Sequence, residues 1–315
     1  MLSALKNNPP LYRELKKFNF KSIIGYLVRY VVSAFYSNIV KKPVYHRGVT
    51  ACVITKNDIW LKESILSIID HIDELVIVDS STGLYLKRNE VFFRELGFKN
   101  LKRIVADLNQ RQARKLAYSK ASYDWILRWD GDVIACDDPR FEFAKILNEI
   151  KGLNSSKYYY KVFFPQILVC YNLNQIRDPW SHVENWVFSN GPDFKWEKMK
   201  WDHPPMPLYY RKINFWTPCA FHLNQIRDES MRIEREIRVE WYKNHPEISN
   251  EDYHEYFMRK MSELRIDLPK LNCIAYNENK FPRIPLLLKP YAGLEHEDIL
   301  QKKVDELEAM VSIDK

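Results

Sequence analysis

The stretch Trp125–Asp137 constrains the fold more than any other, because an apolar run ends abruptly in two carboxylates separated by one glycine. Residues 125–129 have the aromatic and β-branched content of a buried strand, and Asp130 and Asp132 follow at its carboxyl end. Ligands of open α/β sheets bind at that end of the strands. Two such acids need water or a cation between them, and Mg²⁺ or Mn²⁺ is held by pairs of this kind. A plain Asp-Gly surface turn is the alternative, and the triplet alone leaves both open.

Short apolar runs alternate with amphipathic stretches over residues 49–129. Strands are predicted at 49–55, 75–78, 101–105 and 125–129 from their apolar and β-branched content. The stretches between them, 59–71, 87–97 and 110–120, are predicted to be helices. Strands that alternate with helices favour a parallel sheet with right-handed crossovers. The predicted fold class is therefore α/β, with a mostly parallel sheet flanked by helices.

Three loops should meet at the carboxyl edge of this sheet, namely 55–58, 79–83 and 130–132. Asp79 can accept hydrogen bonds from a base or ribose, and Thr55 and Asn57 can contact a base edge. Arg111 and Arg114, three residues apart on one helix face, can pair with phosphate. Each residue alone is more often solvated, so the prediction of a nucleotide site rests on their joint placement.

The excess positive charge lies in an amino-terminal arm, residues 1–47. Nine Lys or Arg side chains against Glu14 give this arm +8, so the other residues sum to −1 of the total +7. Because the rest of the chain, outside the arm, is not basic, a nucleic-acid partner is not expected. Residues 22–40 are apolar, but Arg29 in their middle argues against a membrane span. An amphipathic helix on an anionic membrane surface and a helix packed on the rest of the protein both stay open.

The five cysteines, Cys52, Cys136, Cys170, Cys219 and Cys273, are odd in number and have no pair at metal-ligand spacing. We expect reduced thiols in a cytosolic protein. The predicted location is cytoplasmic, and peripheral at the inner face of the membrane if the arm binds lipid.

Four motifs, taken in order, resemble a known family. They are Val53-Ile-Thr-Lys-Asn57, Glu74-Leu-Val-Ile-Val-Asp79-Ser-Ser-Thr-Gly83, Gln112-Ala-Arg114 and Trp125-Ile-Leu-Arg-Trp-Asp130-Gly-Asp132. Residues 49–135 thereby resemble the nucleotide-binding half of the family-2 glycosyltransferases, which have the Rossmann-like GT-A fold. Lys115 departs from the family, which usually continues its Ala-Arg with Asn. Segments 188–196 and 201–203 are similar to the acceptor side of members related to lipopolysaccharide-core glucosyltransferases.

The resemblance implies a nucleotide-sugar donor and a divalent Mn²⁺ or Mg²⁺ ion on Asp130 and Asp132. His222 matches a place where the family carries a histidine, often the third protein ligand of the metal. His203 is a further candidate, and either histidine could instead be an ordinary hydrogen-bonded core residue.

The implied reaction moves the sugar to a hydroxyl of a glycan or lipid-linked glycan acceptor. Because the family inverts the anomeric carbon, a carboxylate must act as general base. Asp202 is the first candidate for this base, Glu184 the second and Asp193 a third.

The predicted organisation has three parts: the arm 1–47, a catalytic domain 48–228 and a helical C-terminal extension 229–315. The catalytic domain divides into a nucleotide-binding half, 48–136, and an acceptor half, 137–228. The last helix, 298–311, could dock on the domain or on a second subunit. A sugar nucleotidyltransferase is one alternative, although it would favour a glycine-rich loop after the first strand; a noncatalytic glycan-binding module is the other.

Overall fold

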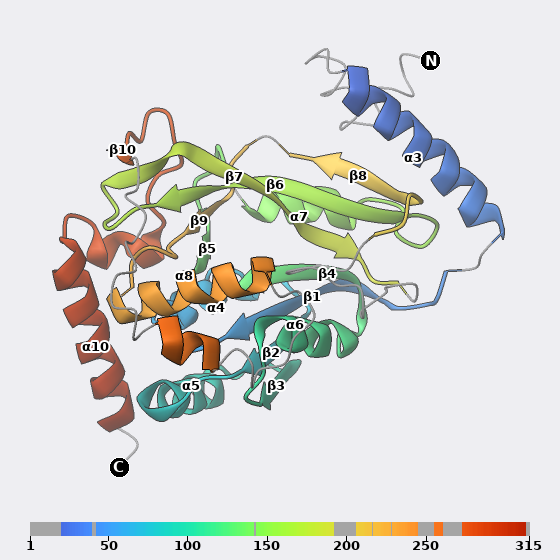
Figure 1. Ribbon diagram of the computed structural model, residues 1–315. Coiled ribbons are helices and arrows are strands. Elements are labelled where there is room, and N and C mark those ends of the chain that lie inside the picture. Colours follow the sequence, from blue (N-terminus) through green and yellow to red (C-terminus); the bar gives the residue numbers. More distant parts are fainter. Residues whose placement is uncertain are drawn as a thin grey trace.

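The structure, a computed structural model, describes residues 20–39, 42–141, 143–191, 206–215, 217–227, 229–244, 255–260 and 273–312. Its centre is a ten-stranded mixed sheet (Figure 1). The strands are β1 (His46–Thr55), β2 (Glu74–Asp79), β3 (Leu101–Val105), β4 (Tyr123–Asp130), β5 (Val133–Ala135), β6 (Tyr159–Val169), β7 (Gln175–Ser189), β8 (Tyr210–Asn214), β9 (Ala220–His222) and β10 (Cys273–Ala275). The helices are α3 (Phe20–Ile39), α4 (Leu61–Leu66), η1 (Ile69–His71), α5 (Gly83–Leu96), α6 (Gln110–Ser119), α7 (Phe143–Lys151), α8 (Glu229–Asn244), η3 (Leu286–Tyr291) and α10 (His296–Ser312).

The strand order β3-β2-β1-β4 forms a parallel half of the sheet, and β7, β6, β9 and β5 continue it beyond β4. The chain moves outward from β1 through β2 to β3, and then returns to place β4 on the other side of β1. The carboxyl ends of β1 and β4 therefore flank a topological switch point. Among the strands described, β5 and β7 run against the others, so the predicted α/β class with a mostly parallel sheet is confirmed.

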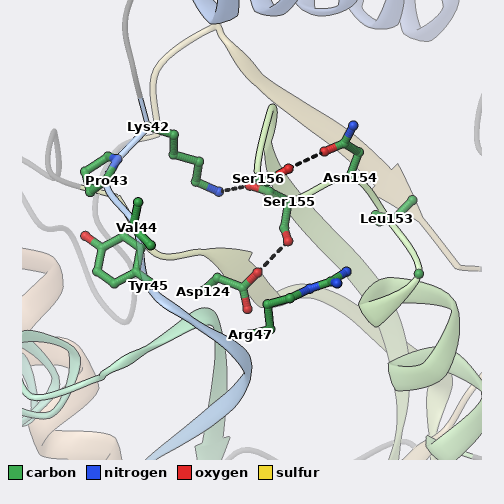
Figure 2. A pocket seen from close by; sticks show the side chains of 11 residues that line it. Lys42, Pro43, Val44, Tyr45, Arg47, Asp124, Leu153, Asn154, Ser155 and Ser156 are labelled. Atoms are coloured by element: carbon green, nitrogen blue, oxygen red, sulfur yellow. Dashed lines mark hydrogen bonds between the residues drawn. The ribbon is translucent and has the colours of Figure 1, made fainter.

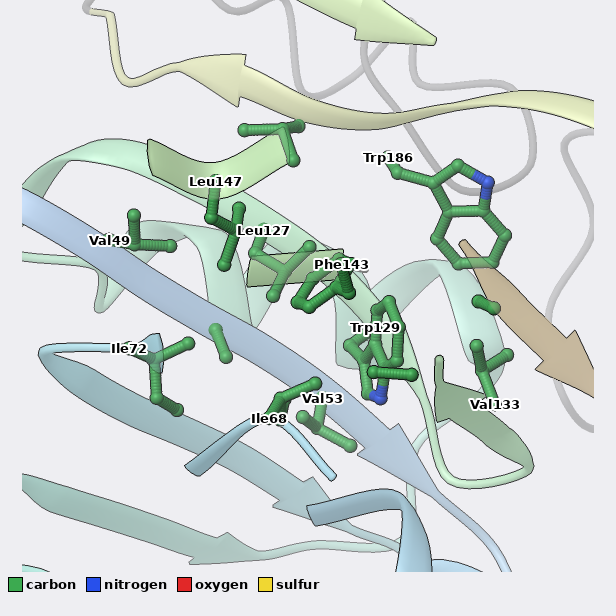
Figure 3. Close-up of a cluster of buried hydrophobic side chains, with 14 of the residues drawn as sticks. Val49, Val53, Ile68, Ile72, Leu127, Trp129, Val133, Phe143, Leu147 and Trp186 are labelled. Carbon is green, nitrogen blue, oxygen red and sulfur yellow. The ribbon is translucent and has the colours of Figure 1, made fainter. Parts of the chain in front are cut away.

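Both faces of the parallel half are covered, which explains its nearly continuous apolar strands. Val49, Ala51 and Val53 of β1 lie in one core cluster with residues of α4 and α7, including Phe143 and Leu147 (Figure 3). Cys52 points to the opposite face, where it packs among residues of α6. The period-two alternation of a strand thus sends neighbouring residues into two separate cores.

The prediction of a single helix over 59–71 is wrong, because this segment forms two short helices, α4 and η1. Two serines of the segment bind the chain near the acidic pair. Ser64 Oγ donates to the Asp130 carbonyl at 2.8 Å, and Ser67 Oγ accepts from the Ala135 backbone N–H at 3.0 Å. These tertiary bonds tie the segment to β4 and β5, and they override the local helical pattern.

The prediction that all five cysteines are reduced thiols is wrong for Cys170 and Cys273, which form a disulfide. Cys273 is the first residue of β10, which pairs with β7 and so brings together cysteines 103 residues apart. A cross-link over so long a loop stabilises mainly by restricting the unfolded chain. Cys52, Cys136 and Cys219 are buried thiols, and burial raises the pKa of each.

The arm packs on the sheet through α3, which lies along β8 (Figure 1). Arg29 Nη1 donates to the carbonyls of Pro207 and Tyr210 at 3.3 and 3.2 Å, and Tyr36 stacks on Tyr209. These contacts explain an arginine in the middle of an apolar helix. Among the residues described, no helix is both long and apolar enough to span a bilayer.

The C-terminal helix α10 docks on its own chain, next to α5. Its Ile299 and Leu307 are buried, and the Lys303 ammonium lies 2.6 Å from a carboxylate oxygen of Glu63. The residues predicted to form a helical extension also contribute β10 to the sheet. Pairing with a second subunit through α10 stays a prediction.

Candidate functional site

The loops after β1 and β2 are hydrogen-bonded to each other at the carboxyl edge. The Asn57 side-chain oxygen accepts from the Thr82 backbone N–H at 2.9 Å, and the Asn57 N–H donates to Ser81 Oγ at 3.0 Å. Asn57 has a φ of 56°, a left-handed conformation that asparagine tolerates better than most residues. Thr55 Oγ1 donates to Asp58 Oδ2 at 3.1 Å. Thr55 and Asn57 therefore shape this edge, and their predicted contact with a base stays a prediction.

Asp79 ends β2 at this edge and is fully buried. The Arg103 guanidinium donates to Asp79 Oδ2 at 2.7 Å, and the Asn89 amide donates to both carboxylate oxygens at 3.1 and 3.2 Å. The Ser81 backbone N–H also donates to Asp79 at 3.0 Å. The Asp79 carboxylate therefore holds the loop after β2 through contacts inside the protein. The predicted contact of Asp79 with a base or ribose stays a prediction. The partners Asn89 and Arg103 lie on α5 and β3, and no local motif marks them.

Asp130, the last residue of β4, forms an ion pair with Arg114 of α6. Arg114 is fully buried and also donates to the carbonyls of Trp129 and Cys52 at 2.9 and 3.3 Å. Its guanidinium therefore joins α6 to β1 and β4 from inside the protein. This position does not support the prediction that Arg114 pairs with phosphate. Arg111, one turn earlier on the same helix, is half-buried.

Asp132 faces a different cation, Arg227. Arg227 Nη2 lies 2.6 Å from Asp132 Oδ2 and 2.7 Å from Asp58 Oδ1, so one nitrogen bridges two acids from two loops. His222 Nε2 lies 3.4 Å from the other oxygen of Asp132. Burial raises the pKa of the Asp58 carboxyl above its ordinary value, Arg227 opposes the rise, and Asp132 adds to it. Asp58 and Arg227 were missed in the sequence, where each reads as an ordinary loop residue.

Gly131 makes the approach of Asp58 to Asp132 possible. A Cβ atom built at Gly131 would lie 2.7 Å from Asp58 Oδ2, closer than real Cβ contacts come. The glycine of the acidic triplet is therefore required by close packing against the first loop.

As arranged, these side chains do not fit a divalent ion. Guanidinium groups already form ion pairs with Asp130, Asp132 and Asp58, and the Gln166 side-chain nitrogen faces His222 Nδ1 at 3.0 Å. A neutral imidazole that accepts at Nδ1 carries its proton on Nε2, which then cannot ligate a metal. Within the described part of the chain, no three or more His, Cys, Asp or Glu side chains are grouped, as they lie with Arg227 present, so that they could hold a metal ion. The Mn²⁺ or Mg²⁺ prediction is left without support from this geometry.

No family model and no curated protein matches this sequence. Among solved structures, TarS of S. aureus has 14% identity and a TM-score of 0.36, with 68% of this chain and 42% of that chain covered. The chain thus spans less than half the length of that protein. A TarS fragment, residues 1–349, has 14% identity and a TM-score of 0.37, covering 70% of this chain and 73% of that one.

The inositol-1-phosphate CTP transferase from T. maritima has 12% identity and a TM-score of 0.36, covering 71% of this chain and all of that one. Likenesses at this level establish neither a shared family nor a shared activity.

Of the three candidate general bases, only Glu184 lies among the described residues. Asp202, Asp193 and the candidate ligand His203 lie outside the described residues. Glu184 lies on β7 and forms an ion pair with the buried Arg128 of β4. The antiparallel register, in which Leu127 faces Val187, places Glu184 toward the Asp130 end of β4.

A cavity of about 430 Å³ lies at the opposite, amino end of β1 and β4. Figure 2 shows Lys42 reaching Ser155, whose carbonyl accepts from the ammonium at 2.5 Å, and Asp124 bound to the Ser155 hydroxyl. Burial lowers the pKa of Lys42 to about 8, against the opposing effect of Asp124. The cavity shares no residue with the carboxyl-edge site.

Proposed function

We propose that this protein is a glycosyltransferase that moves a sugar from a nucleoside diphosphate donor to a hydroxyl of a glycan or lipid-linked glycan. The observation that carries the proposal is the grouping of Asp58, Asp130, Asp132 and Arg227 at the switch point between β1 and β4. Ligands of open α/β sheets bind in the crevice outside the carboxyl ends of strands at such a point. The motif resemblance of residues 49–135 supports the choice of a nucleotide-sugar donor.

In the proposed reaction, the acceptor oxygen attacks the anomeric carbon while the bond from that carbon to the diphosphate oxygen breaks. The acceptor proton passes to a carboxylate, and the negative charge leaves with the nucleoside diphosphate. Asp202 remains the first candidate for the proton acceptor. Glu184 is the second, and its ion pair with Arg128 would have to loosen for that role. Stabilising the leaving diphosphate is the main electrostatic task of the site.

Hydrolysis of a panel of UDP-, GDP-, dTDP- and CDP-sugars by the full chain tests this function. We expect one nucleotide class to be released as the nucleoside diphosphate, because water can replace the acceptor at a slow rate. Formation of pyrophosphate from a nucleoside triphosphate and a sugar phosphate would instead identify a sugar nucleotidyltransferase. Binding of glycans with neither reaction would identify a noncatalytic module.

We also propose that the outward face of α3 rests on an anionic membrane surface. The side of the helix away from β8 carries an outer stripe of exposed apolar residues, 45–69% accessible: Ile24, Leu27, Val28, Val31, Phe35 and Ile39. The arm that contains this stripe carries a net charge of +8. Apolar burial combined with attraction to anionic headgroups is the usual basis of interfacial binding.

Vesicle flotation tests the outer stripe. We expect full-length protein to float with phosphatidylglycerol vesicles, and Val31→Asp with Phe35→Asp to lower the vesicle partition coefficient at least about tenfold. Each apolar side chain buried in the interface contributes about 1.5–3 kcal/mol. Val304→Asp is the matched control, because Val304 is 42% exposed on α10. Equal flotation of the double variant and the control would refute the membrane proposal.

A further inference from the structure

The two acids bridged by Arg227 come from different strand ends. Asp58 follows β1 and Asp132 follows β4, and their side chains are 10% and 7% exposed. Two buried carboxylates that lie close together repel one another, and a positive charge between them allows both to stay ionised. That position is the one a divalent cation would take. In this protein a guanidinium of the chain itself lies there, 2.6 and 2.7 Å from the two oxygens.

Arg227 is held in this position by its backbone. The Leu223 N–H donates to the Asp132 carbonyl at 2.8 Å, and the Trp60 indole donates to the Ile226 carbonyl at 3.2 Å. The segment 223–227 is thus tied to the loops after β4 and β1, the same loops that carry the two acids. With 18% of its side chain exposed, Arg227 also borders solvent at the mouth of the switch point.

We propose that Arg227 is the resident cation of this site, in the place that a divalent ion would occupy between Asp58 and Asp132. Its planar guanidinium, which suits phosphate oxygens, then supplies the positive charge that faces the donor diphosphate. The second part rests on the proposed function, whereas the first part, the position of the cation, does not. The role assigned here to Arg227 replaces the one predicted for a Mn²⁺ or Mg²⁺ ion.

Removing the guanidinium should turn the same side chains into a metal site. Asp58, Asp132 and His222 would offer two carboxylates and an imidazole. Mn²⁺ accepts such a set once the His222 ring proton moves from Nε2 to Nδ1 and the Gln166 amide flips so that its oxygen accepts from Nδ1. We therefore expect Arg227→Ala to gain Mn²⁺ affinity and to lose nucleoside diphosphate affinity in the absence of metal. Added Mn²⁺ should restore the nucleotide affinity of the variant, because one cation replaces the other.

Isothermal titration calorimetry on the full chain tests both parts. MnCl₂ is titrated into wild type, Arg227→Ala and Arg227→Lys; UDP, GDP, CDP and dTDP are then titrated in EDTA and in MnCl₂. We expect Arg227→Ala to bind Mn²⁺ about 10- to 100-fold more tightly than wild type, and the preferred nucleotide more weakly in EDTA by a similar factor. Arg227→Lys keeps a cation, so its Mn²⁺ affinity should stay near that of wild type.

Arg140→Ala is the matched control, since Arg140 forms an ion pair with Asp138 at 2.8 Å outside the site. Circular dichroism checks that each variant is folded, and Arg227→Gln replaces Arg227→Ala if the latter is not. Wild type that binds Mn²⁺ as tightly as the variant would overturn the inference, as would a variant that gains no Mn²⁺ affinity. Wild type that binds none of the four nucleotides in either buffer would refute the proposed function, and the Mn²⁺ titrations would still decide the position of the cation.

Discussion

Replacing Arg114 by methionine is expected to lower the free energy of unfolding by about 3–5 kcal/mol, the range for removing one partner of a buried ion pair. Arg114 is fully buried, pairs with Asp130, and donates to carbonyls of β1 and β4. The variant keeps the apolar stem but leaves a carboxylate and carbonyl oxygens without their charged donor. Because the Asp130 side chain is 23% exposed, water can solvate part of it, which places the expected value toward the lower end.

Urea denaturation followed by circular dichroism measures this effect. The neighbouring Lys115→Ala is the control, because Lys115 is exposed on the same helix and such surface changes stay within about 0.5 kcal/mol. A loss of less than about 1 kcal/mol in Arg114→Met would show that the buried guanidinium is not a structural link, and would reopen its predicted contact with phosphate.

If the proposed function holds, Asp132→Asn is expected to lower the turnover of the sugar-nucleotide donor by about 10²–10³-fold, the usual cost of losing one preorganised electrostatic contact. Asp132 Oδ2 holds the Arg227 guanidinium at 2.6 Å, and the neutral amide would hold it more weakly. In the proposed function, this carboxylate keeps Arg227 in the position from which it faces the diphosphate. Because Asp132 is only 5% exposed, some stability should be lost as well.

The measurement is the rate of nucleoside diphosphate release from the sugar nucleotide that wild type hydrolyses. Asp305→Asn serves as the control for charge, because Asp305 is exposed on α10, where it accepts a hydrogen bond from Gln301. Thermal melting identifies any variant that is unfolded at the assay temperature. A folded Asp132→Asn protein with wild-type turnover would place the reaction elsewhere on the molecule.

Local patterns were sufficient to predict the frame of the site. β3 has the predicted bounds, and β2 and β4 end on Asp79 and Asp130, one residue beyond the predicted ends of their apolar runs. A strand with both faces covered is recognisable because several apolar residues in succession have no other stable arrangement. The amino end of α6 is also set by neighbouring residues, because Asn109 and Gln112 form a capping box and are only three positions apart in the sequence.

Contacts between distant segments could not be predicted in this way. The disulfide depends on β10 pairing with β7, and the break between α4 and η1 depends on Ser64 and Ser67 reaching β4 and β5. The partners of Asp79, on α5 and β3, depend on how those elements pack. In each case the sequence offers many side chains able to make the contact.

The sequence by itself determined the alternating strands and helices and the edge at which the acids gather, because both follow from short-range periodicity and strand direction. Only the tertiary structure decided which cation faces those acids. Arg227 lies 169 residues from Asp58 and 95 from Asp132 along the chain, and any of its 48 Lys or Arg side chains is chemically able to pair with a carboxylate. The turn after β9, hydrogen-bonded to the loops of β1 and β4, selects this one by position.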